Sequence, residues 1–248
     1  MLISQGDARS VDADRRLACT LAAVAGALNA AAFQAVGFFS ANMTGNVSAL
    51  SAHLAVNDLL TAAFYLSIVA AFIGGALVST LLINLGRRRR VHAIYAFSIL
   101  VEAVLLALLG CADLWLSASL RGPVLIVGLS FLMGLQNATV TRISDARVRT
   151  THVSGMVTDI GIELGMLVDI ARGRERADAP YHTRLRLHGQ TVLAFLAGGV
   201  VGVFVYRMVG GFLLIGAAGL LLALASTAIL RVHRTPNAAA SPSPHGAD

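Results

Sequence analysis

Two short segments of the chain place a hydroxyl side chain directly before a glycine, between long apolar runs. Residues 40–50 read SANMTGNVSAL and residues 149–161 read RTTHVSGMVTDIG. The hydroxyls of Thr44 and Ser154 suit a helix N-cap, because they can accept a hydrogen bond from the first-turn N–H groups. Glycine allows a tight turn and a close approach of backbones. Since a helix N-terminus carries partial positive charge, each segment predicts a half-helix that begins beside an anion or another polar group.

The two segments belong to a longer repeated pattern. GALNAAAF at 26–33 and GLQNATVT at 134–141 share the form G-x-x-N-A, and each precedes one hydroxyl–glycine segment. Inverted repeats are common in secondary transporters, whose binding sites form where interrupted helices meet near the middle of the membrane. The alternative is a chance match between Ala-rich spans whose small residues serve helix packing. The repeat predicts a solute site formed by Asn29, Thr44, Gly45, Asn46, Asn137, Ser154 and Gly155.

A carboxyl group lies in the middle of an apolar run. Glu102 is centred in IYAFSILVEAVLLALLG, where a charged side chain costs at least about 2.5–3.5 kcal/mol. We therefore expect Glu102 to be protonated, to be hydrogen-bonded to a neighbouring helix or to face a wet cavity. One interpretation is a proton-carrying group. The other is a neutral side chain bonded to Ser98 or a facing Asn, which contributes only to packing specificity.

Two further acidic residues lie on the second short segment. Asp159 and Glu163 are four residues apart and share one helix face. Together with the hydroxyl of Thr158 they could bind a cation that is coupled to transport, or a substrate amine. The alternative is the wet side of an interfacial helix, paired with Arg149 or Arg172.

Several chemistries lack the residues that they need. The chain has no lysine, which excludes a Schiff base, a pyridoxal phosphate anchor and a P-loop lysine. Hydrolase, metalloprotease and dinucleotide-binding motifs are absent from the sequence. Cys19 and Cys111 have no CxxC or His spacing, and neither His53 nor His152 has a second ligand at i+4, so neither a disulfide framework nor a metal site is supported. We expect no enzymatic activity, no cofactor and no nucleic-acid partner.

The composition is that of an integral membrane protein. Of the 248 residues 56% are hydrophobic and 13% are charged, and the mean hydropathy is +0.75, whereas a soluble domain carries about 25% charged residues. Two shorter segments, 44–56 and 154–170, are left open as re-entrant, interfacial or spanning. Apolar segments long enough to cross the roughly 30 Å hydrocarbon core cover residues 17–36, 59–85, 91–111, 122–141, 187–206 and 210–230.

These segments predict an all-α fold, a polytopic membrane helical bundle. It has six transmembrane helices, two short re-entrant or half-helices and an inverted 3+3 repeat, because an odd number of spans reverses the second copy. A cytoplasmic segment at 1–16 precedes a single membrane domain at 17–231, and a disordered cytoplasmic tail follows at 232–248. The repeats cover about 17–111 and 122–230.

The arginines orient the chain. All 19 basic residues are arginines, and cytoplasmic loops are enriched in basic residues. With six spans and both termini in the cytoplasm, only Arg121 and Arg207 lie outside. Eight spans would instead move the cluster at 87–90 to the outer face.

Pairs of glycines four residues apart mark close helix contacts. Gly161 and Gly165 form one such pair, and Gly198 and Gly202 form another. We expect both pairs to pack within the chain, and a homo-oligomer is left open.

ANMTGN, GLQNATV and RTTHVSGMVTD, in this order, resemble the YoaK-like family of bacterial multi-pass membrane proteins, which is also catalogued as a domain of unknown function (DUF). The resemblance covers residues 17–230. It implies a six-span protein of the bacterial cytoplasmic (inner) membrane, and it brings no substrate. The family often has an acid where this chain has Asn29, which argues against proton coupling at that position. It also has Thr-Gly where this chain has Ser154-Gly155.

The pattern favours a secondary transporter or permease, with the lipid bilayer and an unknown small solute as partners. The solute site would lie between the inverted repeats, near the middle of the membrane. The alternative is a scaffold or partner-binding subunit that does not transport. Its basis is the basic loop at 142–186, which could bind anionic lipid or a soluble partner.

Overall fold

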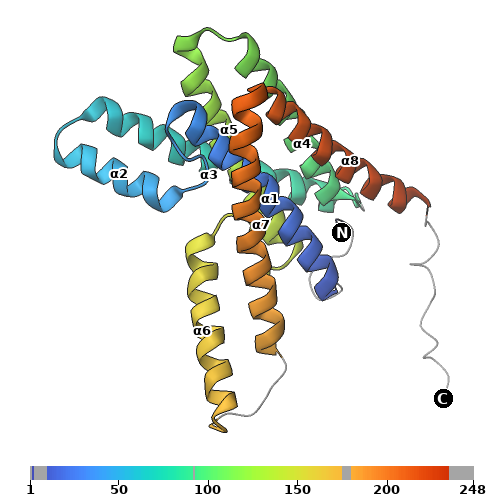
Figure 1. Cartoon of the computed structure of the whole chain (residues 1–248). Coiled ribbons are helices and arrows are strands. Elements are labelled where there is room, and N and C mark those ends of the chain that lie inside the picture. Colours follow the sequence, from blue (N-terminus) through green and yellow to red (C-terminus); the bar gives the residue numbers. More distant parts are fainter. Residues whose placement is uncertain (1, 3–9, 92, 175–179, 235–248) are drawn as a thin grey trace.

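The fold of the described chain is entirely helical, as predicted. The computed structural model describes residues 2, 10–91, 93–174 and 180–234 (Figure 1). Of the predicted tail at 232–248, residues 232–234 instead belong to the last helix, and residues 235–248 lie outside this range, as do most of the first nine residues. In chain order the helices are α1 (Val11–Val36), α2 (Met43–Ala55), α3 (Leu59–Arg88), α4 (Ile94–Trp115), α5 (Ala118–Ile143), α6 (Val153–Ala171), α7 (Pro180–Val209) and α8 (Phe212–Arg234).

Six of the described helices are long and apolar enough to cross a membrane, namely α1, α3, α4, α5, α7 and α8. This confirms the predicted polytopic bundle. The first helix begins at Val11, earlier than the apolar run at 17–36, because Ser10 caps it. The Ser10 hydroxyl accepts a hydrogen bond from the Ala13 N–H at 3.2 Å.

The helices α1 and α7 touch backbone to backbone. A Cβ atom at Gly26 of α1 would overlap the carbonyl of Phe195 in α7, and one at Gly198 of α7 would overlap the carbonyl of Ala23 in α1. Gly202, one turn further along α7, faces the backbone of α1 as well. Of the two predicted glycine pairs, the one in α7 therefore packs within the chain.

The helices α3 and α5 make the equivalent contact. A Cβ atom at Gly75 of α3 would overlap the carbonyl of Phe131 in α5, and one at Gly134 of α5 would overlap that of Phe72 in α3. In all four helices the contacted carbonyl belongs to the residue three positions before that helix's own glycine. The α1–α7 and α3–α5 contacts therefore have the same arrangement, although the residues that form them are not all identical.

Most of the remaining packing relates the two halves in the same way, although α4 also packs against α5 and the equivalent contact of α8 with α1 is much smaller (Figure 1). The helix α2 packs along α3 as α6 packs along α7, while α4 packs against α8 and α1 against α5. The α2–α3 and α6–α7 pairs form hairpins that project from the bundle in different directions. This exchange of contacts between 17–111 and 122–230 is the arrangement that two copies of one unit produce.

The hairpin of α2 and α3 is fixed at its turn by Asp58. The Asp58 carboxylate accepts from the Thr61 N–H at 3.2 Å and lies 3.0 Å from His53 Nδ1. The hydrogen bonds from Thr61, and to a smaller extent His53, hold the pKa of Asp58 below its ordinary value. The charged carboxylate therefore caps α3 and ties the end of α2 to it.

The expectation of within-chain packing is wrong for Gly161 and Gly165. A Cβ atom at either position in α6 would meet no atom within 4 Å. The reason is that α6 contacts α7 along a different face, which carries Glu163. Glycine at these two positions leaves an open strip on the helix surface.

The glycine contacts predict a specific pattern of stability. Gly75→Ala and Gly198→Ala should each lower the free energy of unfolding by about 1–3 kcal/mol, because the added methyl group forces the helix backbones apart. Gly219→Ala is the matched control, since its Cβ would lie in open space on α8 and alanine favours a helix. Thermal unfolding in detergent micelles measures the effect. Equal melting temperatures for the three variants would contradict the packing.

Candidate functional site

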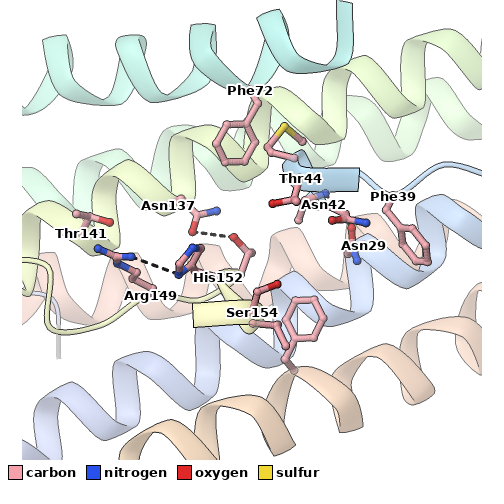
Figure 2. A pocket seen from close by; sticks show the side chains of 15 residues that line it. Asn29, Phe39, Asn42, Thr44, Phe72, Asn137, Thr141, Arg149, His152 and Ser154 are labelled. Carbon is pink, nitrogen blue, oxygen red and sulfur yellow. Dashed lines mark hydrogen bonds between the residues drawn. The ribbon is translucent and has the colours of Figure 1, made fainter. Parts of the chain in front are cut away.

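The N-terminal ends of α2 and α6 line one cavity of about 480 Å³ (Figure 2). Asn42, Met43 and Thr44 come from the start of α2, and His152, Val153 and Ser154 come from the start of α6. The two short helices belong to different halves of the chain. Each half therefore contributes one helix N-terminus to a shared space.

The capping of α2 differs from the expectation. Thr44 was expected to be the N-cap, but the cap is Asn42, whose Oδ1 atom accepts from the Gly45 N–H at 3.1 Å. Thr44 lies inside the first turn, with its backbone carbonyl accepting from the Ser48 hydroxyl. A Cβ atom at Gly45 would overlap the Asn42 amide. Glycine therefore lets the Asn42 side chain keep its capping position over the first turn.

The start of α6 repeats this arrangement with other residues. The cap position is His152 and not the expected Ser154, and it makes no side-chain capping bond. A Cβ atom at Gly155 would overlap the His152 imidazole. In both segments the residue three positions before the glycine lies over the first turn, and this explains why a glycine follows the hydroxyl residue.

The two G-x-x-N-A asparagines hold the loops that lead into α2 and α6. Asn29 Oδ1 accepts from the Ala41 N–H at 2.8 Å, and Asn137 Oδ1 accepts from the Thr151 hydroxyl at 2.9 Å. Both donors stand two residues before the first residue of the short helix. Asn46 adds a bond from its Nδ2 atom to the Phe39 carbonyl at 3.2 Å. These bonds fix where each helix begins.

The structure brings four of the seven predicted solute-site residues into the cavity wall, namely Asn29, Thr44, Asn137 and Ser154. Gly45 and Asn46 lie behind the wall, where they support the start of α2. Gly155 lines the neighbouring cavity.

The electrostatics of the main cavity are positive. Arg149 is the one charged side chain among its described lining residues, and its Nη1 atom lies 3.3 Å from His152 Nδ1. None of the described residues in the wall carries a carboxylate. The backbone N–H groups at the starts of α2 and α6 add partial positive charge.

Sequence reasoning missed Phe72 and Phe195, which form part of the wall. Each stands three residues before a packed glycine, in α3 and in α7. Pairing the glycines of the two halves in the sequence would have shown that these two phenylalanines are equivalent. Figure 2 shows Phe72 on one side of the cavity, with α2 and α6 beginning nearby.

A second cavity of about 350 Å³ adjoins the first. The two cavities share Arg149 and His152, and the second is also lined by Arg147, Asp159 and His188. The polar residues of the loop before α6 therefore connect the main cavity to a polar space between α1, α6 and α7.

The three predicted coupling residues lie apart. Asp159 is exposed on the second cavity, and Glu163 is buried against α7, where it pairs with His188 at 3.1 Å instead of the expected Arg149 or Arg172. Glu102 is buried in α4 outside both cavities and accepts from Gln136 Nε2 at 3.0 Å.

The expected partner of Glu102 was Ser98 or an asparagine. Ser98 bonds instead with Thr139, at 2.7 Å.

Within the part of the chain that the structure describes, no group of three or more His, Cys, Asp or Glu could hold a metal ion. Cys19 and Cys111 are free thiols.

Comparison with known proteins gives a family and no function. A family model described as "Protein of unknown function (DUF1275)" matches residues 17–227. No curated protein and no solved structure matches the chain.

The asparagine bonds predict two separate local effects. Asn29→Ala should speed amide hydrogen exchange in residues 40–46, and Asn137→Ala should do so in residues 150–156. Each variant loses one hydrogen bond worth about 1 kcal/mol. The free energy of opening the loop falls by that amount, and amide exchange becomes about fivefold faster. Asn84→Ala, which removes an exposed bond with Arg142, is the control. Exchange that is unchanged in both loops would contradict the assigned role.

Proposed function

The chain belongs to the DUF1275 family and is an integral membrane protein with six candidate spans, and on this premise we propose that it is a permease for a small solute. The solute binds in the cavity where α2 and α6 begin. The observation that carries the proposal is that the two halves of the chain each present a helix N-terminus to this cavity. This is the arrangement in which secondary transporters bind their substrates.

The cavity favours a small anion or a neutral polar solute over a cation. Arg149 and two helix N-termini attract negative charge, and no carboxylate in the described wall opposes them. A volume of about 480 Å³ falls in the range of small-molecule sites, roughly 300–1,000 Å³. Asn29, Thr44, Asn137 and Ser154 supply amide and hydroxyl groups for hydrogen bonds to the solute.

The proposal places the protein in the bacterial cytoplasmic membrane, as a YoaK-like protein with both termini in the cytoplasm. The bilayer is its surroundings, and the small solute is its ligand; it has no enzymatic activity and no nucleic-acid partner. The arginines support this orientation, because only Arg121 and Arg207 then lie outside. The second cavity, with Arg147 and Arg149, then opens towards the cytoplasm.

Aromatic contacts support closure on the outer side. The rings of Phe33 and Phe39 stack with centroids 4.4 Å apart, and Phe38 packs edge-on against Phe64 and Tyr65 at 5.1 Å and 5.4 Å. These residues surround the loop before α2. In this conformation the solute reaches the cavity from the cytoplasmic side, and transport requires the aromatic cluster to open.

Alternating access can be tested without knowing the solute. Thr44→Cys and Ser154→Cys, each in a Cys19→Ser, Cys111→Ser background, should react with a membrane-impermeant thiol reagent applied to either side of oriented vesicles. Ser51→Cys on α2 should react only from outside, and Ala171→Cys at the end of α6 only from inside; both native side chains are exposed. A cavity residue that reacts from one side alone would favour the non-transporting scaffold.

The charge of the cavity can be tested with the same variants. At Ser154→Cys, the ratio of reaction rates for an anionic and a cationic methanethiosulfonate reagent should fall by about fivefold when Arg149 becomes Gln, because one nearby charge is lost. Arg172→Gln, at the far end of α6, is the control and should leave the ratio unchanged. If both variants leave the ratio unchanged, Arg149 does not set the charge preference.

A further inference from the structure

Glu102 is a buried carboxyl group without a cation. Its side chain is 0% exposed, its Oε1 atom accepts from Gln136 Nε2 at 3.0 Å, and its Oε2 atom has no hydrogen-bond partner. A carboxylate in this position would lack compensation for its lost hydration. The neutral acid, with a proton on Oε2, fits the surroundings better.

The elements packed against Glu102 supply no counter-charge. The helix α4 packs against α3, α5 and α8, and the structure records Gln136 as the polar partner of Glu102. The described titratable and charged groups on these four helices stand toward the helix ends: Tyr65, Arg87 and Arg88 on α3, Tyr95, Cys111 and Asp113 on α4, Arg121 and Arg142 on α5, and Arg231 on α8.

Gln136 connects this carboxyl group to the solute cavity. Its Oε1 atom lies 3.5 Å from the hydroxyl of Thr150, and that hydroxyl also lies 3.5 Å from Oδ1 of Asn137. Asn137 lines the cavity and holds Thr151. A continuous row of side chains therefore runs from the interior of α4 to the loop that begins α6.

We propose that Glu102 is the proton-binding group of this protein, and that Gln136 and Thr150 couple its protonation to the position of the α6 N-terminus. This inference rests on the proposed function, because it makes the permease proton-coupled. Loss of the proton from Oε2 creates a carboxylate that attracts the Gln136 amide and the Thr150 hydroxyl. Their movement loosens the loop before α6, and rebinding of one proton restores it. The proton passes to water when it leaves and comes from water when it returns, and no other covalent bond forms or breaks.

The first experiment measures proton occupancy at Glu102 directly. Dicyclohexylcarbodiimide reacts with protonated carboxyl groups in apolar surroundings, and peptide mass spectrometry locates the adduct. Labelling of Glu102 in the full chain should decrease as the pH rises from 5.5 to 9.5, and Glu102→Gln should abolish it. Asp113 is the control carboxylate, because Tyr206 donates to it at 2.9 Å and Arg121 lies 3.8 Å away, and it should stay unlabelled. Labelling of Glu102 that is absent or constant over this range would overturn the proposal.

The second experiment measures coupling to the cavity. The reaction rate of Ser154→Cys, divided by the thiolate fraction of the same cysteine as its ultraviolet absorbance gives it, should change by at least about fivefold between pH 6 and pH 8.5. Both Glu102→Gln and Gln136→Leu should remove this change, while Gln136→Leu keeps the labelling of Glu102. An unaltered pH profile in Gln136→Leu would overturn the proposal, even if Glu102→Gln does not fold.

The two proposals fail in different ways. Reaction of Ser154→Cys from both sides at every pH, with no pH dependence, would remove proton coupling and leave the permease in place. Reaction from one side only, together with pH-dependent labelling of Glu102, would remove the permease and leave a proton-binding membrane protein.

Discussion

The structure depends on two helix crossings where the backbones touch because glycines have no side chain. Between apolar helices in lipid there is little hydrophobic driving force, so close van der Waals packing fixes how helices cross. Gly26 and Gly198 set the crossing of α1 and α7, and Gly75 and Gly134 set that of α3 and α5. In each half the asparagine that anchors the short helix stands three residues after one of these glycines. The crossing points therefore determine where α2 and α6 begin.

Most of the fold could be predicted from the sequence because its determinants are local. A run of about 20 apolar residues must span a bilayer as a helix, and the G-x-x-N-A pattern placed both anchoring asparagines near the site. The predicted N-caps, Thr44 and Ser154, were wrong. They were chosen because their side chains are good caps when a helix is considered in isolation. In the folded chain the loop bonds to Asn29 and Asn137 start each helix two residues earlier.

Contacts between distant segments were the part that local patterns could not provide. The pairing of Glu163 with His188 and of Glu102 with Gln136 depends on how α6 meets α7 and how α4 meets α5. The sequence of one helix does not show which residue of another helix will be the partner of its buried carboxyl group. Arg149 was interpreted as a loop charge because its role depends on the loop before α6 folding back over the cavity.

The two halves share one geometry but differ in the chemistry that closes them. His53 in α2 and Glu163 in α6 occupy equivalent positions, each eight residues after the glycine of its short helix. Their partners, Tyr65 in α3 and His188 in α7, are also equivalent, because each stands ten residues before a packed glycine. The first pair stacks its rings with centroids 5.6 Å apart, while in the second His188 Nδ1 lies 3.1 Å from Glu163 Oε1. The first pair is aromatic, whereas the second is polar and its His188 lines the second cavity. The two halves therefore share a backbone arrangement and differ in the side chains that hold each short helix to its neighbour.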